Sequence, residues 1–326
     1  MSMESEVTIM NFLKTLPLLF LSLTTISCGS NNKLNIMVPT GAPAISFYDF
    51  VNQGEKYNVE TNSDPKMIIA SMSSPNSPDM VVLPINAGLQ AMRQGVSYKL
   101  ASVISFGNAM LCSTGNDDNN QMDEGDVVVL FQKGQIPDLM FKNITGDLYD
   151  KLDIKYVNAA SDANGVLTTG TYIDEHGTIP VDYVLVADPA ARKALANNPK
   201  AKIVKIVRDA FKEKYPGYDV MQAAVFIKNK VPLDLASTTM LTLKDSILNG
   251  LENPTLIKEG MDKKGTPQEV SSFYGAPSDL TYLSLMDNNG LGLGFLKAYD
   301  NKASIDKTLS IISPALGGTY EEDYLK

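Results

Sequence analysis

The sequence predicts an α/β protein in which short buried strands alternate with helices. Three observations indicate this class. Short apolar runs, too short for most helices, recur along the chain as far as residue 227. Turns rich in Gly, Pro, Asn or Asp follow most of these runs and open helix-like segments. The order strand, turn, helix, strand is typical of a sheet with parallel strands flanked by helices.

The first part of the chain, up to residue 112, shows this order clearly. A strand is followed by a turn in which Pro43 suits the first position of a helix. The residues around Phe106-Gly107-Asn108 interrupt two further apolar runs. We expect strands at residues 34–38, 80–83, 99–105 and 110–112, and helices at residues 44–51, 64–71 and from 84–88 to 93.

The pattern resumes after an acidic loop at residues 116–126. The last hundred residues are predicted to be mainly helical, and the glycine-rich segment 290–294 to be a connection between helices. In between, we expect strands at residues 127–131, 154–157, 183–186, 202–207 and 222–227, and helices opening at 134–138, within 158–169 and over 187–195.

Composition limits the function. The chain has 326 residues, of which 44 % are hydrophobic and 20 % charged, which suits a globular protein of two domains. The net charge is −9 and basic clusters are lacking, which argues against nucleic acid or an anionic membrane surface as a partner. The chain has only two cysteines, Cys28 and Cys112, and one histidine, His176, so we expect no metal site. Cys112 is predicted to be a buried small residue.

Three apparent motifs do not carry chemistry. The acidic loop counted from Asp117 has Met122 and Val128 where an EF-hand needs Gly and Glu. The segment 290–294 lacks the spacing and the preceding strand of a dinucleotide-binding loop. His176 lies in a polar turn without a nucleophile motif, and we predict an exposed loop residue. We therefore expect no catalytic residue and no cofactor.

The amino terminus resembles a bacterial lipoprotein signal. Lys14 precedes a short apolar run that ends at Ser27-Cys28-Gly29, and this run is too short to span a bilayer. The resemblance implies cleavage before Cys28, acylation of that cysteine, and a tether at residues 29–33. Residues 1–28 are then the signal peptide. Because residues 1–9 are acidic, Met10 is a possible true start.

Several turns that follow strands and begin helices are candidate ligand contacts. In an open α/β sheet, ligands bind beyond the carboxyl ends of the strands, where helix amino termini offer free N–H groups. Aromatic residues that could stack on a flat ligand stand near these turns: Phe47, Tyr48, Phe106, Tyr172 and Tyr274. The predicted ligand-binding residues are Thr40, Gly41, Ala42, Asn86, Ala87, Ser105, Asn108, Gly134, Gln135, Ser161, Asp162, Asp188 and Tyr274.

The same turns resemble those of a known family. From residue 34 to about residue 245, the chain is similar to the type 2 periplasmic substrate-binding proteins of ABC importers, in the superfamily for nitrate, sulfonates and thiamine precursors, and within it to a lipoprotein branch. The segments that carry the resemblance are 39–43, 78–86, 105–108, 134–138, 181–190 and 218–227. This chain departs from the family at Asp188-Pro189, where Glu-Pro is usual, and at the turn Lys133-Gly134-Gln135.

The resemblance implies a two-lobed fold in which each lobe is a mostly parallel sheet flanked by helices. Lobe one would be residues 33–108 and 226–326, and lobe two residues 109–225. Two hinge strands, near residues 107–112 and 221–227, would join them, and a ligand between the lobes would drive closure.

The implied function is that of an exported, lipid-anchored, non-enzymatic solute-binding protein that delivers its ligand to an ABC permease. We expect a monomer. The candidate turns contain no Arg and only Lys133, which favours a small neutral or weakly charged organic ligand, such as a vitamin precursor, over a strong anion. Two alternatives stay open: an enzyme on the same fold, such as a dehydratase, and a surface adhesion or sensory lipoprotein that contacts no permease.

Overall fold

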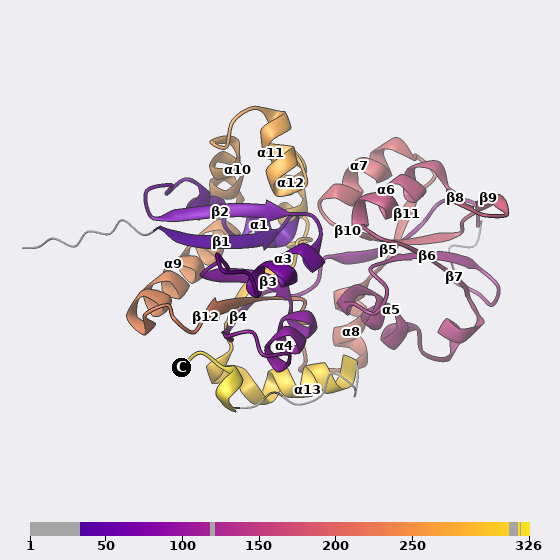
Figure 1. The fold of residues 1–326 in the computed structure, drawn as a ribbon. Helices are drawn as coiled ribbons and strands as arrows, with labels where there is room; N and C mark the ends of the chain where they lie inside the picture. The colour runs from indigo at the N-terminus through magenta and orange to yellow at the C-terminus, as the bar shows by residue number, and fades with distance from the viewer. Residues whose placement is uncertain (1–32, 118–120, 313–318, 320) are drawn as a thin grey trace, which may run out of the picture. The chain divides into compact units, whose positions relative to one another are not determined.

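A computed structural model describes residues 33–117, 121–312, 319 and 321–326 (Figure 1). The predicted signal peptide, Cys28 and the tether up to residue 32 lie outside the described residues. Residues 33–326 form one compact unit.

The first sheet has six strands in the order β13-β4-β12-β3-β1-β2. Strands β1 to β4 all run in one direction, and β12 and β13 run in the opposite direction. The carboxyl ends of β1, β3 and β4 therefore lie at the same edge of this sheet. The strands are β1 (Leu34–Pro39), β2 (Tyr57–Asn62), β3 (Met80–Pro84), β4 (Tyr98–Ser105), β12 (Ala223–Lys228) and β13 (Leu293–Lys297).

The second sheet has five strands in the order β11-β5-β10-β6-β7. Strand β5 alone runs against the other four. A separate hairpin is formed by β8 (Thr171–Asp174) and β9 (Gly177–Pro180). The strands of the second sheet are β5 (Ala109–Ser113), β6 (Val127–Phe131), β7 (Asp153–Val157), β10 (Tyr183–Ala187) and β11 (Lys202–Ile206).

The chain crosses between the sheets twice. It passes from β4 to β5 through residues 106–108, and it returns into β12 through residues 220–222. The two crossings are bonded to each other: Gln222 donates its backbone N–H to the Ser105 carbonyl (2.9 Å) and its side-chain amide to Asn108 Oδ1 (3.1 Å). Because β4 ends and β5 begins there, the carboxyl edge of the first sheet is joined to the edge of the second sheet where β6, β7, β10 and β11 end.

Helices cover both sheets (Figure 1). Their starts follow ordinary capping chemistry: the Asp64 carboxylate accepts the Lys66 N–H at 2.9 Å, and Thr266 and Glu269 form a capping box. Around the first sheet lie α1 (Ala42–Ile45), α2 (Tyr48–Val51), α3 (Pro65–Met72), α4 (Ile85–Arg93), α9 (Leu233–Glu252), α10 (Pro254–Asp262), α11 (Pro267–Tyr274), α12 (Ser278–Met286) and α13 (Lys302–Ile312). Around the second lie α5 (Ile136–Thr145), η1 (Gly146–Lys151), α6 (Ala160–Thr169), α7 (Ala190–Asn197) and α8 (Val207–Lys214). Two further 3-10 turns, η2 (Tyr299–Asn301) and η4 (Glu321–Asp323), flank the last helix.

Two hydrophobic clusters make the core. One fills the face of the first sheet that α1, α2 and α9 to α12 cover. The other begins under α3, α4 and α13 on the opposite face and continues into the second sheet, so residues of both sheets share it. Helix α13 contributes Ile305, Leu309 and Ile312 to it, and its Ile311 carbonyl accepts a hydrogen bond from the Asn143 side chain of α5 at 2.9 Å. The last helix therefore packs against both parts of the molecule.

The α/β class and most predicted strands are confirmed, with four corrections. The predicted helix at 44–51 is two short helices, α1 and α2, because Phe47 leaves helical geometry between them. Strand β2 was missed because, as an edge strand, it shows no buried residue. The hairpin β8–β9 was missed for the same reason. The segment 290–294 does not connect two helices, as predicted, but leads from α12 into β13.

Candidate functional site

The predicted ligand-binding residues lie at the two joined edges. On the first sheet, the turn 40–42 follows β1, residues 86–87 begin α4 after β3, and Ser105 ends β4. On the second sheet, residues 134–135 follow β6, residues 161–162 open α6 after β7, and Asp188 follows β10.

Hydrogen bonds bring part of this set together around Gln222. The Ile85 N–H, next to Asn86, donates to the Gln222 carbonyl at 3.0 Å. The Asn108 side chain donates to the Asp188 carbonyl at 2.6 Å, and the Asp188 N–H donates back to the Asn108 carbonyl at 2.9 Å. Ser105 and Asn108 thus bond directly to one glutamine, Asn86 follows a residue that does, and Asp188 bonds to Asn108. Sequence reasoning missed Gln222, because a single polar residue at the start of a strand carries no signal of its own.

Tyr274 lies beside the first predicted turn. Its carbonyl accepts the Gly41 N–H at 2.9 Å, and the next residue, Gly275, has a positive φ of 79°. A Cβ on Gly275 would come within 3.0 Å of the Gly41 nitrogen, so the close approach of α11 to this turn requires glycine. The Tyr274 side chain is fully buried, and burial raises the pKa of its hydroxyl. The tyrosine is therefore a neutral hydroxyl at neutral pH.

Asp188 already has a complete set of partners. Its carboxylate, which is fully buried, receives hydrogen bonds from Arg192 Nε and Nη2 at 2.8–3.1 Å and from the Ser284 hydroxyl at 2.8 Å. Arg192 also pairs with the exposed Asp287 at 2.9 Å. Since Asp188 and Arg192 belong to the second sheet and Ser284 and Asp287 to the region of α12, this network ties the two parts together. A direct ligand contact of the Asp188 carboxylate stays a prediction.

The glycine-rich segment 290–294 packs against the same place. The Phe106 N–H donates to the Gly292 carbonyl at 2.7 Å. Gly292 has a φ of 60°, and a Cβ there would overlap the backbone of Gly107. A Cβ on Gly290 would overlap the Asp188 carboxylate. Glycine is thus required because the segment lies directly on the crossing.

Backbone groups in the turns of the second sheet already form hydrogen bonds with side chains of the helices that follow them. The Gly134 N–H donates to the buried Asp138 carboxylate at 2.7 Å. The Asp162 carboxylate accepts the Ala159 N–H at 3.1 Å and so caps α6. Ser161 and Asp162 are exposed. No contact among the described residues links these two to Gln222, and their role in ligand binding stays a prediction.

Four polar side-chain atoms at these edges have no hydrogen-bond partner in the part of the chain that the structure describes. They are Asn86 Oδ1, Ser105 Oγ, Gln135 Oε1 and the Tyr274 hydroxyl. Asn86 is 8 % exposed, Ser105 1 % and Tyr274 0 %. An unsatisfied buried polar group costs about 1–3 kcal/mol, and native structures contain few of them. All four belong to residues that the sequence analysis singled out.

Two of the aromatic residues near the turns have other roles. Phe47 is fully buried and meets Phe50 edge to face at 5.3 Å, and the Tyr48 hydroxyl donates to the Ser246 carbonyl at 3.1 Å. Both pack in the core of the first sheet, and nothing in the described residues places them at a ligand.

Surface hollows on the described residues lie outside the predicted contacts, and two of them are close to β1 and to the crossing. A hollow of about 500 Å³ beside the crossing is lined by Phe106, Arg208, Lys212 and Phe295, among others, but by none of the predicted contacts. Its charges are paired: Lys212 meets Asp219 at 2.5 Å, and Arg208 donates to backbone carbonyls.

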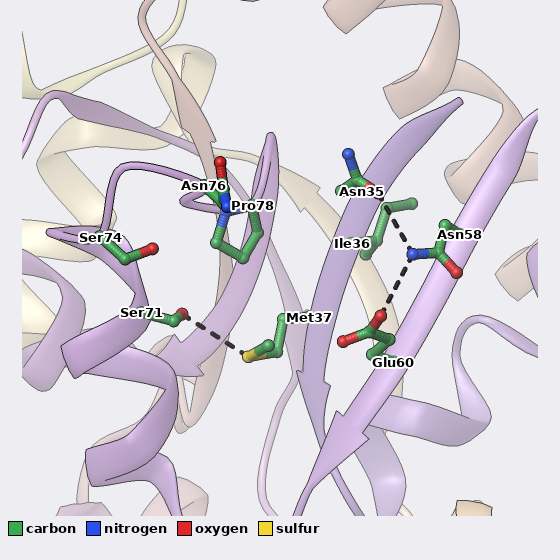
Figure 2. A pocket seen from close by; sticks show the side chains of 9 residues that line it. All are labelled: Asn35, Ile36, Met37, Asn58, Glu60, Ser71, Ser74, Asn76 and Pro78. Carbon is green, nitrogen blue, oxygen red and sulfur yellow. Dashed lines mark hydrogen bonds between the residues drawn. The ribbon is translucent and has the colours of Figure 1, made fainter. Parts of the chain in front are cut away.

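The second hollow, of about 250 Å³, lies over the first half of β1 (Figure 2). Asn58 there donates to Asn35 and to Glu60, both at 3.2 Å, and the Ser71 hydroxyl points at the Met37 sulfur (Figure 2). It is set back from the carboxyl ends of the strands, where the predicted contacts lie.

Other sequence predictions concern single residues. Cys112 is fully buried, as predicted, and burial raises the pKa of its thiol to about 12. His176 lies on the turn of the β8–β9 hairpin with 81 % of its side chain exposed, which confirms that prediction. Among residues 33–117, 121–312, 319 and 321–326, no cluster of acidic, histidine or cysteine side chains is arranged to hold a metal. No helix within the described ranges combines the length and apolar character needed to cross a bilayer.

Solved structures share this architecture. An ABC transporter protein from Parabacteroides distasonis superimposes with a TM-score of 0.68 at 16 % identity, over 89 % of this chain and 96 % of that one. The periplasmic aliphatic sulphonate binding protein from Escherichia coli gives a TM-score of 0.63 at 11 % identity, over 86 % of both chains.

A zinc-bound ligand-binding component of an ABC-type import system from Staphylococcus aureus superimposes with a TM-score of 0.61 at 13 % identity, over 90 % of this chain and 96 % of that one. The chain has the periplasmic-binding-protein fold. No protein-family model and no curated protein matches the sequence. Because these identities are low, the likeness establishes the fold and leaves the ligand open.

Proposed function

We propose that the protein is the solute-binding component of an ABC importer, capturing a small organic ligand between its two sheets. The observation that carries this proposal is the meeting of the two carboxyl edges at the crossing, with predicted contacts from both sheets at that place. Ligands of open α/β sheets bind at such edges. The solved structures that share this fold include binding components of importers, which supports the same role for this chain.

The proposal includes a closing motion. Residues 33–105 with 223–326 form one lobe and residues 109–219 form the other, because β12 enters the first sheet at Ala223 and not at residue 226 as the sequence predicted. The crossings at 106–108 and 220–222 act as the hinge. Only two short segments, bonded to each other through Gln222, connect the sheets in sequence. A ligand that contacts both lobes stabilises the closed form by its differential affinity for it.

Binding is tested by a thermal-shift screen on the chain from Gly29, which retains the compact unit 33–326. The panel comprises vitamins and their precursors, sulfonates, oxyanions, amino acids and nucleosides. A ligand at 100 times its Kd adds about 2.7 kcal/mol, which raises Tm by about 5 °C in a protein of this size. Calorimetric titration then confirms a stoichiometry of one. A panel without any hit contradicts the proposal and favours a surface role without transport.

Membrane anchoring is the second part of the proposal: the chain is exported and its Cys28 is acylated. The two cysteines provide a matched control, because Cys112 is buried in the second sheet. Radiolabelled palmitate fed to expressing bacteria is expected to label the wild type and Cys112→Ala. It is expected not to label Cys28→Ala. Equal labelling of all three proteins contradicts the anchoring site.

A further inference from the structure

Four unpartnered polar atoms point to the chemistry of the ligand. They come from both parts of the molecule: Ser105 from β4, Asn86 and Tyr274 from helices around the first sheet, and Gln135 from the cap of a helix around the second. Asn86 follows Ile85, which bonds to Gln222. Gln135 caps the helix after β6, the strand that pairs with β10, and Asp188 follows β10 directly. Each group is therefore placed at the joined edges and lacks a protein partner among the described residues. A ligand is the natural partner for them.

Two arginines close to the crossing, the partly exposed Arg192 and the buried Arg208, bond groups of the protein itself. Arg192 donates from Nε and Nη2 to Asp188, Asp287 and Ser284. Arg208 donates to the carbonyls of Asn288 and Asn289 at 3.2 and 2.9 Å. Neither guanidinium can turn to an anionic ligand without breaking these bonds, so neither offers the bidentate pairing that strongly anionic groups require.

Lys133, the lysine of the candidate turns, is exposed. Its ammonium lies 4.9 Å from the centre of the Tyr156 ring, where a cation is attracted to the aromatic face. It therefore supplies an exposed, screened charge rather than a desolvated one. The buried unpartnered groups at these edges are all uncharged amides and hydroxyls.

A side-chain amide presents an acceptor and a donor side by side. Its best complement is a group with the same two functions on neighbouring atoms, since two parallel hydrogen bonds then form at once. Asn86 and Gln135 are two such amides on opposite sheets. The hydroxyls of Ser105 and Tyr274 can each donate to, or accept from, a further polar atom of the ligand.

We propose that the site binds an uncharged molecule with a cis-amide edge, an N–H next to a C=O, as in lactams, cyclic imides and cyclic ureides. One of the two amides, Asn86 or Gln135, pairs with that edge through two parallel hydrogen bonds, and the other amide binds a remaining polar atom together with Ser105 and Tyr274. This inference rests on the proposed solute-binding function and narrows its ligand class. It separates this chain from the sulphonate-binding protein whose fold it shares.

The test is calorimetric titration of the chain from Gly29 with matched probes. Pyrrolidin-2-one, succinimide and hydantoin carry the edge, and their N-methylated counterparts lack the N–H. Methanesulfonate and taurine are the anionic probes. At least one edge-bearing probe is expected to bind, and methylation of its nitrogen is expected to weaken it at least tenfold. The sulfonates are expected not to bind.

Variants locate the binding. Asn86→Leu and Gln135→Met are each expected to lower the affinity of the edge-bearing probe at least tenfold. Asn86→Asp, which keeps the shape of the side chain, serves if Asn86→Leu does not fold. Asn143→Leu is the matched control: Asn143 also has an unpartnered side-chain oxygen, but it lies near the far end of α5 from Gln135. The affinity of the Asn143→Leu variant for the edge-bearing probe is expected to match that of the wild type.

The outcomes are distinguishable. Sulfonate binding without binding of any edge-bearing probe overturns the ligand class but leaves the solute-binding function standing. Edge-bearing probes that bind equally well to the Asn86 and Gln135 variants overturn the assignment of these residues. Failure of every probe here and of the wider thermal-shift panel overturns the function and the inference together.

Discussion

Replacing Arg192 by Met tests the network that ties α7 to α12. The change leaves the Asp188 carboxylate, whose side chain has no exposed surface, with only the Ser284 hydroxyl and no counter-charge. Breaking a buried ion pair in this way costs about 3–5 kcal/mol. Because the Arg192 side chain is 20 % exposed, water reaches part of the site, and we expect about 3 kcal/mol.

The loss is measurable by heat and by urea. In a chain of this size, about 3 kcal/mol lowers Tm by about 6 °C. Urea unfolding monitored by circular dichroism gives the free energy directly, provided that the m-value is unchanged.

Two further variants make the result interpretable. Asp287→Asn removes only the partner that is 64 % exposed, so it should cost less than about 1 kcal/mol. The double variant Arg192→Met with Asp188→Leu removes both buried charges and should recover most of the loss. A cost below about 1 kcal/mol for Arg192→Met, or equal costs for Arg192→Met and Asp287→Asn, refutes the reasoning.

Three other predictions concern packing and ionisation. Gly292→Ala is expected to cost more than about 2 kcal/mol in urea, because its Cβ would overlap Gly107, whereas Gly95→Ala, with positive φ but open space, should cost less. Burial raises the pKa of the Cys112 thiol to about 12, so we expect it to react with Ellman's reagent at pH 8 only after the protein unfolds. Rapid labelling of the folded protein contradicts the burial of this thiol. Burial also raises the pKa of Tyr98 to about 12, so this tyrosine contributes stability below pH ~10 that is lost as pH rises through 12. Tyr98→Phe should flatten the alkaline decline of Tm, and an unchanged decline would contradict the assignment.

The sequence predicts an element well where successive residues are buried alike. Buried strands such as β3 and β10 show as unbroken apolar runs because neighbours cover both their faces. Edge strands give no such run, and β2 was missed for that reason. Strand β13 was hidden by Gly292 and Gly294, whose purpose is close contact with the crossing, a tertiary feature that no local pattern records.

The candidate site was predictable in position but not in detail. Turns after strands are visible in the sequence, and Asn86 and Gln135 were singled out on that basis. Arg192 follows Asp188 by four residues, but the other partner, Ser284, lies 96 positions away, so the hydrogen bond to Ser284 could not be foreseen. Gln222 was missed because its importance comes from the two crossings that it bonds together.

The path of the chain through the two sheets has a consequence for the order of assembly. The first sheet starts at Leu34 but needs β12 and β13, which end at Lys297, whereas every strand of the second sheet has appeared by Ile206. A chain that emerges amino terminus first can therefore complete its middle part while its beginning still waits for strands not yet made. During that interval the unfinished edges of β3 and β4, which β12 later separates, are open to wrong pairing. The vulnerable period in the synthesis of this protein is therefore the making of its middle part, after β4 and before β12 appears.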